Sequence, residues 1–153
     1  MKISDYEVKN NPKFKLSEIN TDYSEDLSSK TKAEKHLTSN IEEMFELQSK
    51  LYADDRYALL IIFQAMDTAG KDGAIKHVMT GLNPQGTAVT SFKAPSVEEL
   101  DHDYLWRASN NLPRKGNIGI FNRSYYEEVL VVRVHGLIHK QRLPETLIGK
   151  DIW

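Results

Sequence analysis

Hydrophobic and polar residues follow two different rhythms in the first half of this chain. From Ser29 to Ala53, apolar residues recur at three- and four-residue steps between lysines and glutamates, which predicts an amphipathic helix that packs on a core. The run Leu59–Phe63 is short, apolar and rich in branched side chains, which is typical of a parallel strand buried on both faces. We therefore expect a long helix that leads into a buried strand.

Helical and extended patterns continue to alternate toward the C-terminus. Ser96 and Glu99 have the spacing of a capping box, which predicts a helix start. The order of strands and helices predicts an α/β fold with a parallel sheet and right-handed crossovers. The further strands are expected at 86–92 and 117–122, and the further helices at 74–79, 96–108 and 125–140.

The length and composition indicate one domain with an N-terminal extension. Residues 1–28 are polar and weakly periodic, and we expect them to form an arm lying over a domain of residues 29–153. A length of 153 residues suits one domain, and the 40% of hydrophobic residues suffice for a core. We find no signal-peptide pattern, and the apolar run at Leu59 is too short to span a membrane.

The net charge and the absence of cysteine limit which binding partners and which cellular compartment we expect for the protein. The formal net charge of −2 provides no global basic field, so we do not expect nucleic acid as a partner. Because the apolar run at Leu59 is too short to span a bilayer, we expect no membrane as a partner either. The chain has no cysteine, which excludes a disulfide framework and a cysteine metal site. This composition is compatible with the cytoplasm, where we expect the protein.

The segment after the first strand carries a partial phosphate-loop pattern. It ends in Gly70-Lys71 before a predicted helix, where backbone N–H groups and the helix dipole favour an anion, and Lys71 adds a positive charge. The pattern GxxxxGK[ST] is incomplete, because Ala65 replaces the first glycine and Asp72 replaces the serine or threonine. A phosphate loop and a plain strand-to-helix turn are both open interpretations.

Asp67 is an unusual residue for such a loop. A carboxylate close to a bound phosphate is unfavourable unless a cation lies between them. This argument predicts that Asp67 contacts a metal ion, either directly or through water. The alternative interpretation is an aspartate that stabilises a turn or a helix N-terminus.

A second polar segment, Asn122-Arg123-Ser124, follows the third predicted strand. Ligands of parallel sheets bind at the carboxyl ends of the strands. If the first and third strands are neighbours, Arg123 lies opposite Lys71 and provides a guanidinium fork for phosphate. The alternative is that Arg123 pairs with Glu127, one helical turn further on. The four side chains expected to converge are Asp67, Lys71, Asn122 and Arg123.

Three blocks of this sequence resemble the polyphosphate kinase 2 family. The block QAMDTAGKDGAIKHVMTGLNPQG at 64–86 is similar to the modified Walker A segment of that family, and IGIFNRSYYEEVLVVRVH at 118–135 is similar to its Walker B segment. Between them, SFKAPSVEELDHDYLWR at 91–107 also resembles the family. The resemblance covers nearly everything from about residue 30 to 153, and it implies a P-loop kinase-like three-layer α/β/α fold.

The resemblance also implies an activity. Members of the family transfer a phosphoryl group between inorganic polyphosphate and a nucleotide with Mg²⁺ or Mn²⁺. The third block looks like that of members that phosphorylate AMP, ADP or both, so the implied partners are polyphosphate and AMP, ADP and ATP. Two alternatives stay open: a P-loop NTPase or nucleoside kinase, and a non-catalytic fragment that binds phosphate or nucleotide.

The resemblance assigns roles by position. Asp67 matches a loop aspartate implicated in metal binding and catalysis, Lys71 matches the Walker A lysine, and Arg123 matches an arginine that contacts phosphate. Asn122 stands where many members have the Walker B aspartate, and an amide is a weaker Mg²⁺ ligand than a carboxylate. The rest of the phosphate loop is Thr68, Ala69, Gly70, Asp72 and Gly73. Glu127 and Lys93 also lie in the matching blocks. A long polyanion needs a basic groove, for which Lys76, Lys93 and Arg107 are weaker candidates on charge alone.

The resemblance further implies that the family domain continues beyond Trp153. We expect the remaining part to carry more strands and the lid helices, so this chain is interpreted as an N-terminal portion. A sheet without those strands has an open edge and an uncovered apolar face. We therefore expect a homo-oligomer, or a partner that covers this surface.

Overall fold

The computed structural model describes residues 4, 6–8, 13–20, 29–149 and 152–153. The chain divides into two compact units, residues 1–40 and residues 41–153, and the second contains the sheet. In the first unit, the short 3-10 helix η2 covers Leu16–Glu18. Much of the expected arm over residues 1–28 lies outside the described residues, so the arm stays a prediction.

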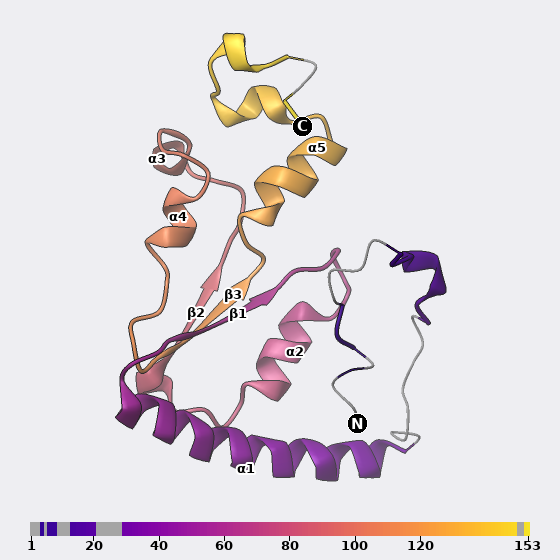
Figure 1. The fold of residues 1–153 in the computed structure, drawn as a ribbon, viewed down its shortest axis with the longest axis vertical. Helices are drawn as coiled ribbons and strands as arrows, with labels where there is room; N and C mark the ends of the chain where they lie inside the picture. The colour runs from indigo at the N-terminus through magenta and orange to yellow at the C-terminus, as the bar shows by residue number, and fades with distance from the viewer. Residues whose placement is uncertain (1–3, 5, 9–12, 21–28, 150–151) are drawn as a thin grey trace. The chain divides into compact units, whose positions relative to one another are not determined.

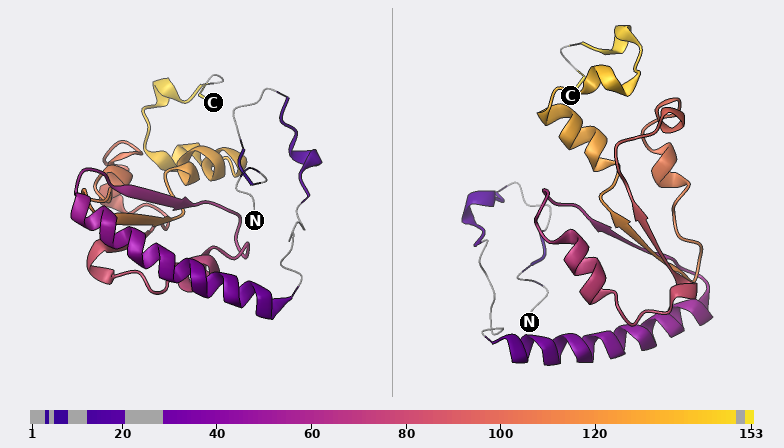
Figure 2. Two further views of the ribbon diagram at one scale, coloured as in Figure 1. Left: turned by 60° about the horizontal axis from the view of Figure 1, so that its bottom comes forward. Right: turned by 180° about the vertical axis from the view of Figure 1, so that it is seen from behind.

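A three-stranded parallel sheet forms the centre of the second unit. The strands lie in the order β1-β3-β2, so each chain crossover returns to the same sheet in the same direction (Figures 1 and 2). At the carboxyl ends, Phe63 and Ser91 both pair with Asn122. The predicted α/β class and the neighbouring first and third strands are confirmed. The strand bounds are β1 Leu59–Phe63, β2 Thr87–Ser91 and β3 Ile118–Asn122.

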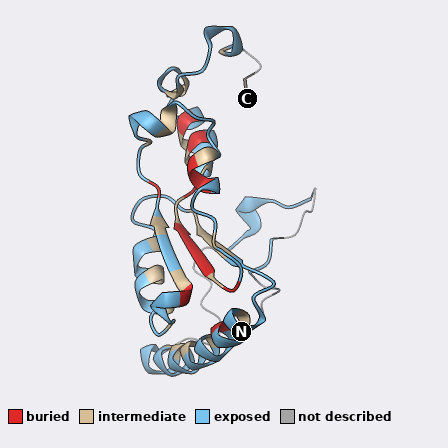
Figure 3. Ribbon diagram, turned by 90° about the vertical axis from the view of Figure 1, so that its left-hand side faces the viewer, coloured by how far each residue is buried: buried red, intermediate tan, exposed pale blue. Residues whose placement is uncertain are grey.

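The buried strand is β3, and the prediction that β1 is buried on both faces is wrong for this chain. Ile120 and Phe121 are 0% and 1% exposed, whereas Leu59 is 46% exposed. β3 pairs with a strand on each side, while β1 pairs only with β3 among the described strands. Figure 3 shows one buried strand between two less buried ones. The apolar run at 59–63 therefore marks a strand correctly but does not show its place in the sheet.

The long helix α1, Lys30–Asp54, confirms the prediction for 29–53 and is tied to the start of β2 by Gln48. The Gln48 amide nitrogen donates to the Asn83 carbonyl at 3.0 Å and to the Thr87 hydroxyl at 2.8 Å. The Asn83 N–H donates to the Gln48 amide oxygen at 2.7 Å. Gln48 is 4% exposed, so these bonds satisfy a buried polar group and fix the amino end of the sheet.

The single helix expected at 96–108 is wrong, because two short helices, α3 (Val97–Leu100) and α4 (Trp106–Ser109), occupy this region. The predicted capping box exists: the Glu99 N–H donates to the Ser96 hydroxyl, and the Ser96 N–H donates to the Glu99 carboxylate. The break lies at Asp103, whose carboxylate accepts from the Leu105 N–H at 2.9 Å. Such a local side-chain bond competes with helical backbone bonding.

The single helix expected at 125–140 is also interrupted. Its first part is the π-helical turn η4, Glu127–Val131, followed by α5, Val132–Val134. Gly136 then adopts φ of 63°, a left-handed conformation that commonly ends helices. Two 3-10 turns follow, η5 at Ile138–Gln141 and η6 at Glu145–Leu147. In the part of the chain that the structure describes, no helix has the length and apolarity to cross a membrane.

Gly119, the second residue of β3, provides a test of how tightly this strand packs against Pro113. A Cβ atom there would lie 2.9 Å from the Pro113 ring. This contact is too close, and because the ring is rigid, the backbone around it would have to shift. Gly119→Ala should lower the free energy of unfolding by about 1–3 kcal/mol, as measured by urea denaturation. Gly73→Ala is the control, because its Cβ meets nothing within 4 Å and alanine is the better helix former. Equal stability of Gly119→Ala and the wild type would show that the Pro113 segment moves aside.

Candidate functional site

The loop between β1 and α2 presents Lys71 at the start of a helix. α2 spans Lys71–Val78 and so begins three residues before the predicted position at residue 74. Gly70 precedes it with φ of 90°, in the left-handed region that glycine adopts without strain. This bend turns the chain directly into α2. The first N–H groups of the helix and the positive end of its dipole thus lie at the end of the loop.

Lys71 holds the loop together through its ammonium group. The Lys71 Nζ donates to the carbonyl oxygens of Ala65 and Met66 at 2.8 and 2.9 Å. An ammonium group has three N–H donors, so one donor remains for an anion. The lysine is therefore positioned by the loop and is still able to bind a ligand.

Arg123 reaches across from the end of β3 to the loop after β1. Its N–H donates to the Phe63 carbonyl at 2.9 Å, which continues the β1–β3 pairing past the strand end. Its φ of 65° is uncommon for a residue other than glycine, and it redirects the chain after the strand. The guanidinium forms an ion pair with the carboxylate of Asp67. The alternative pairing with Glu127 is wrong, since Glu127 accepts from the Gln64 amide at 2.6 Å.

Asn122 and Asp72 form a second bridge between the same two segments. The Asn122 Nδ2 donates to the Asp72 carboxylate at 2.6 Å, although the two residues are 50 positions apart. Asp72 is the second residue of α2 and stands where a phosphate loop usually has serine or threonine. The two bridges hold the Lys71 loop against the end of β3.

These side chains line a cavity of about 450 Å³ at the carboxyl ends of the strands, called here the strand-end cavity. Ala69, Lys76 and Glu127 do not line it; Lys76 is exposed on α2. The cavity thus brings together the two cations and the loop aspartate that were expected to converge. The predicted residues that line it are Asp67, Thr68, Gly70, Lys71, Asp72, Gly73, Lys93, Asn122 and Arg123.

The end of β2 also lines the cavity, with residues that were not predicted from the sequence. Ser91, Phe92 and Ala94 line the cavity beside Lys93. Ser91 pairs with Asn122 in the sheet, so the ends of all three strands meet there. The rule used for the other two strand ends also applies to β2 and would have identified these residues.

The strand-end cavity has oxygen donors suited to a magnesium or manganese ion. Asp67 and Asp72 contribute carboxylates on the same wall as Lys71. Mg²⁺ at phosphate sites is commonly held by one or two carboxylates, with water and substrate phosphate completing the shell. No group of three or more His, Asp or Glu side chains suited to a metal occurs among the described residues. The residues present therefore fit an ion that binds together with phosphate.

The charges in the cavity also fit a phosphate chain. Lys71, Lys93 and Arg123 outnumber the two carboxylates, and the guanidinium offers paired N–H donors at a fixed angle. The cations come from three different segments, the start of α2 and the chain after β2 and after β3. Such an arrangement can position a phosphoryl group and neutralise its charge without a covalent intermediate on the protein.

Comparison with known sequences gives consistent matches. A family model described as "Polyphosphate kinase 2 (PPK2)" matches residues 27–149. An ADP-polyphosphate phosphotransferase of Rhodopseudomonas palustris is 55% identical over 119 residues, covering 76% of this chain and 41% of that protein. An AMP/ADP-polyphosphate phosphotransferase of Meiothermus ruber is 52% identical over 96 residues, covering 63% of this chain and 36% of that protein.

A solved structure extends the comparison to the fold. The crystal structure of polyphosphate kinase 2 from Arthrobacter aurescens TC1 superposes with a TM-score of 0.78 at 38% sequence identity. The match covers 86% of this chain and 49% of that chain. This chain therefore spans less than half the length of the relatives that it matches.

Proposed function

This chain belongs to the polyphosphate kinase 2 family, and from that premise we propose that it transfers a phosphoryl group from inorganic polyphosphate to AMP or ADP in the presence of Mg²⁺ or Mn²⁺. The main support is the convergence of Lys71, Asp67 and Arg123 on the strand-end cavity. The names of the two curated relatives support adenine nucleotides as acceptors and favour neither alternative function.

The proposed mechanism rests on positioning and charge. Lys71, the first N–H groups of α2 and Arg123 bind the phosphoryl group that is transferred, because its oxygens carry the charge that must be stabilised. Lys93, which lines the cavity after the end of β2, binds a neighbouring phosphate of the donor or acceptor. Because the loop carbonyls already orient the Lys71 ammonium, little rearrangement is needed when phosphate enters.

Asp67 has two tasks in this proposal. Its ion pair with Arg123 holds the guanidinium at the cavity wall before substrate binds. Asp67 and Asp72 would hold the metal ion, which when bound neutralises charge on the phosphates. Asn122 would act on Asp72, by orienting its carboxylate, rather than as the metal ligand itself.

We also propose where the protein acts and how it assembles. We place the reaction in the cytoplasm, which a cysteine-free chain suits. Self-association stays a prediction that rests on the open sheet edge at β1.

Formation of ADP from AMP, polyphosphate and Mg²⁺ by the purified chain tests the proposal. We expect ADP to appear only when polyphosphate is present, and to be lost when EDTA removes the metal, because the cavity supplies too few ligands to retain it alone. The products are separated by anion-exchange chromatography, with the Rhodopseudomonas palustris relative as the positive control. Failure to form ADP while the control is active would contradict the proposal for this chain.

A further inference from the structure

Gln64 lies between two groups of contacts that fix the cations of the strand-end cavity. On one side of it in the sequence, the Phe63 carbonyl accepts from the Arg123 N–H at 2.9 Å. On the other side, the next two loop carbonyls accept from the Lys71 ammonium. The Gln64 side chain is partly buried and does not line the cavity. Gln64 therefore belongs to the support of the cavity and not to its surface.

Both ends of the Gln64 amide are bound to the segment after β3. Its Nε2 donates to the Glu127 carboxylate at 2.6 Å, and its Oε1 accepts from the Ser124 hydroxyl at 3.2 Å. A carboxylate has no hydrogen to donate, so Glu127 requires the nitrogen end of the amide. This requirement turns the amide oxygen toward Ser124. The two hydrogen bonds thus form together in one orientation of the side chain.

The Ser124 hydroxyl is a fixed point of attachment. Ser124 is 0% exposed, and its hydroxyl also accepts from the Tyr126 N–H at 3.2 Å. The Ser124 carbonyl accepts from the Glu127 N–H at 3.0 Å, so the two partners of Gln64 are also bound to each other. Because the hydroxyl both donates and accepts, little rotation is left to it.

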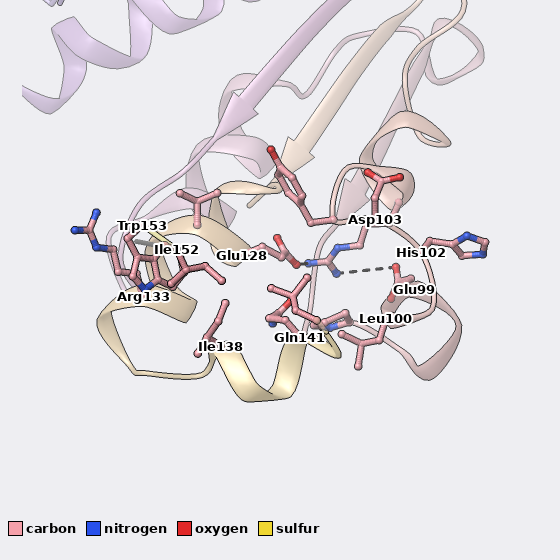
Figure 4. A pocket seen from close by; sticks show the side chains of 15 residues that line it. Glu99, Leu100, His102, Asp103, Glu128, Arg133, Ile138, Gln141, Ile152 and Trp153 are labelled. Atoms are coloured by element: carbon pink, nitrogen blue, oxygen red, sulfur yellow. Dashed lines mark hydrogen bonds and ion pairs between the residues drawn. The ribbon is translucent and has the colours of Figure 1, made fainter. Parts of the chain in front are cut away.

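The turn η4 is anchored from another direction by Glu128. The Glu128 side chain is 7% exposed and forms an ion pair with Arg107 of α4. Figure 4 shows Glu128 and Glu99 approaching the same guanidinium group, in a cavity beside η4. This anchor does not involve the loop after β1. The Gln64 amide therefore attaches the loop to a segment that is already held in place.

We propose that Gln64 is a positioning residue that sets the separation of Lys71 and Arg123 in the strand-end cavity. The inference rests on the proposed function, in which both cations bind the transferred phosphoryl group. Phe63 and Gln64 hold Arg123 and Ser124, so two consecutive residues after one strand are fixed to two consecutive residues after the other. Lys71 is bound to the carbonyls that directly follow Gln64. A shift of the loop at Gln64 would therefore move one cation relative to the other.

The contacts explain why an amide suits this position. A carboxylate there would face the Glu127 carboxylate at hydrogen-bonding distance, where like charges repel. An apolar side chain would leave the buried Ser124 hydroxyl without its acceptor and Glu127 without its donor. Either change should displace the loop while every side chain that lines the cavity is kept.

Gln64→Met tests the inference without adding a charge. Binding of tripolyphosphate to the purified chain is measured by calorimetry, and we expect the affinity to fall at least about tenfold, because both hydrogen bonds of the amide are lost. Gln85→Met is the matched control and should bind as the wild type. Gln85 is an exposed glutamine of the 3-10 turn η3, Pro84–Gly86, which precedes β2 at the other end of the sheet. Urea denaturation establishes that each variant is folded under the conditions of the titration.

An exchange of the two partners separates positioning from a loss of packing. Gln64→Glu should weaken tripolyphosphate binding at least about tenfold, since it places two carboxylates together. The double variant Gln64→Glu, Glu127→Gln again places a donor opposite an acceptor and keeps the net charge of the wild type. It should recover the affinity to within about threefold. Gln85→Glu controls for the added negative charge and should bind as the wild type.

The outcomes distinguish this inference from the proposed function. Unchanged affinity in Gln64→Met, or a double variant as weak as Gln64→Glu, would overturn the positioning role while the phosphate site stands. If a Gln64 variant does not fold, Ser124→Ala takes its place, because it removes one of the two bonds, and unchanged affinity there counts equally against the role. Failure of the wild type to bind tripolyphosphate would contradict the phosphate site, and with it both the proposed function and this inference.

Discussion

Replacing Lys71 by alanine is expected to lower the rate of ADP formation by at least about a hundredfold, because a preorganised charge at the transferred group is lost. The Lys71 ammonium is fixed by two loop carbonyls and lines the strand-end cavity. Alanine removes the charge and also the bonds to Ala65 and Met66, so the loop loses its internal tie. The rate is measured with AMP, polyphosphate and Mg²⁺ at saturating concentrations, so that weaker binding is separated from slower transfer.

Lys50→Ala is the matched control for this prediction. Lys50 is an exposed lysine on α1 and does not line the strand-end cavity. The control should keep the wild-type rate. A Lys71→Ala variant that also keeps the wild-type rate, with an unchanged circular dichroism spectrum, would remove Lys71 from the proposed mechanism.

Asp67→Asn tests a different role in the same cavity. The amide keeps the size of the side chain but removes the charge that pairs with Arg123 and would hold the metal ion. We expect a loss of at least about a hundredfold in rate, since an amide is the weaker Mg²⁺ ligand. Part of the loss should be recovered at high Mg²⁺ concentration, which is measured by titrating the metal. No change in the Mg²⁺ dependence would show that Asp67 acts only by positioning Arg123.

The convergence of Lys71 and Arg123 could be predicted from the sequence because it depends on a general rule of parallel sheets. Carboxyl ends of neighbouring parallel strands meet at one edge, so residues that follow two such strands come together. The rule needed only the strand assignments and the assumption that β1 and β3 are neighbours, which the structure confirms. Details inside the loop, such as the bonds from Lys71 to the carbonyls, depend on backbone geometry that the pattern does not encode.

The features that could not be predicted depend on competition between local and distant contacts. The break between α3 and α4 arises because the Asp103 carboxylate binds the Leu105 N–H, whereas the apolar spacing alone favours a continuous helix. The edge position of β1 depends on strand order, which an apolar run does not specify. The burial of Glu128 was also not predicted, since it depends on an ion pair with Arg107 from another helix.

Arg107 is a buried residue that links the segment after β2 to η4. It is 5% exposed and contacts the Lys93 carbonyl, the Glu128 carboxylate and, at 3.9 Å, the Glu99 carboxylate. Its guanidinium also lies 5.2 Å from the centre of the Phe92 ring in the core. The same side chain thus fixes the wall at Lys93 and directs Glu128, so its loss should disturb folding as well as binding.

Arg107→Met is expected to lower the free energy of unfolding by about 3–5 kcal/mol, because it leaves the Glu128 carboxylate buried without its cation. The measurement is urea denaturation at pH 7. The double variant Arg107→Met, Glu128→Leu is the matched control. It should recover most of the loss, since a buried ion pair is often replaced by apolar side chains at little cost. A double variant as unstable as the single one would show that Arg107 acts through packing on Phe92 rather than through its charge.

The pH dependence of the stability of Arg107→Met provides a second test of whether an unpaired Glu128 charge destabilises this variant. Burial already raises the pKa of Glu128, and removal of Arg107 takes away the charge that opposes this rise. A carboxyl group whose pKa is raised in the folded state contributes stability below its unfolded pKa and loses it as the pH rises through the folded pKa. The deficit of Arg107→Met relative to the wild type should therefore shrink as the pH is lowered toward and below the ordinary glutamate pKa. A deficit that is constant with pH would exclude an unpaired Glu128 charge as its cause.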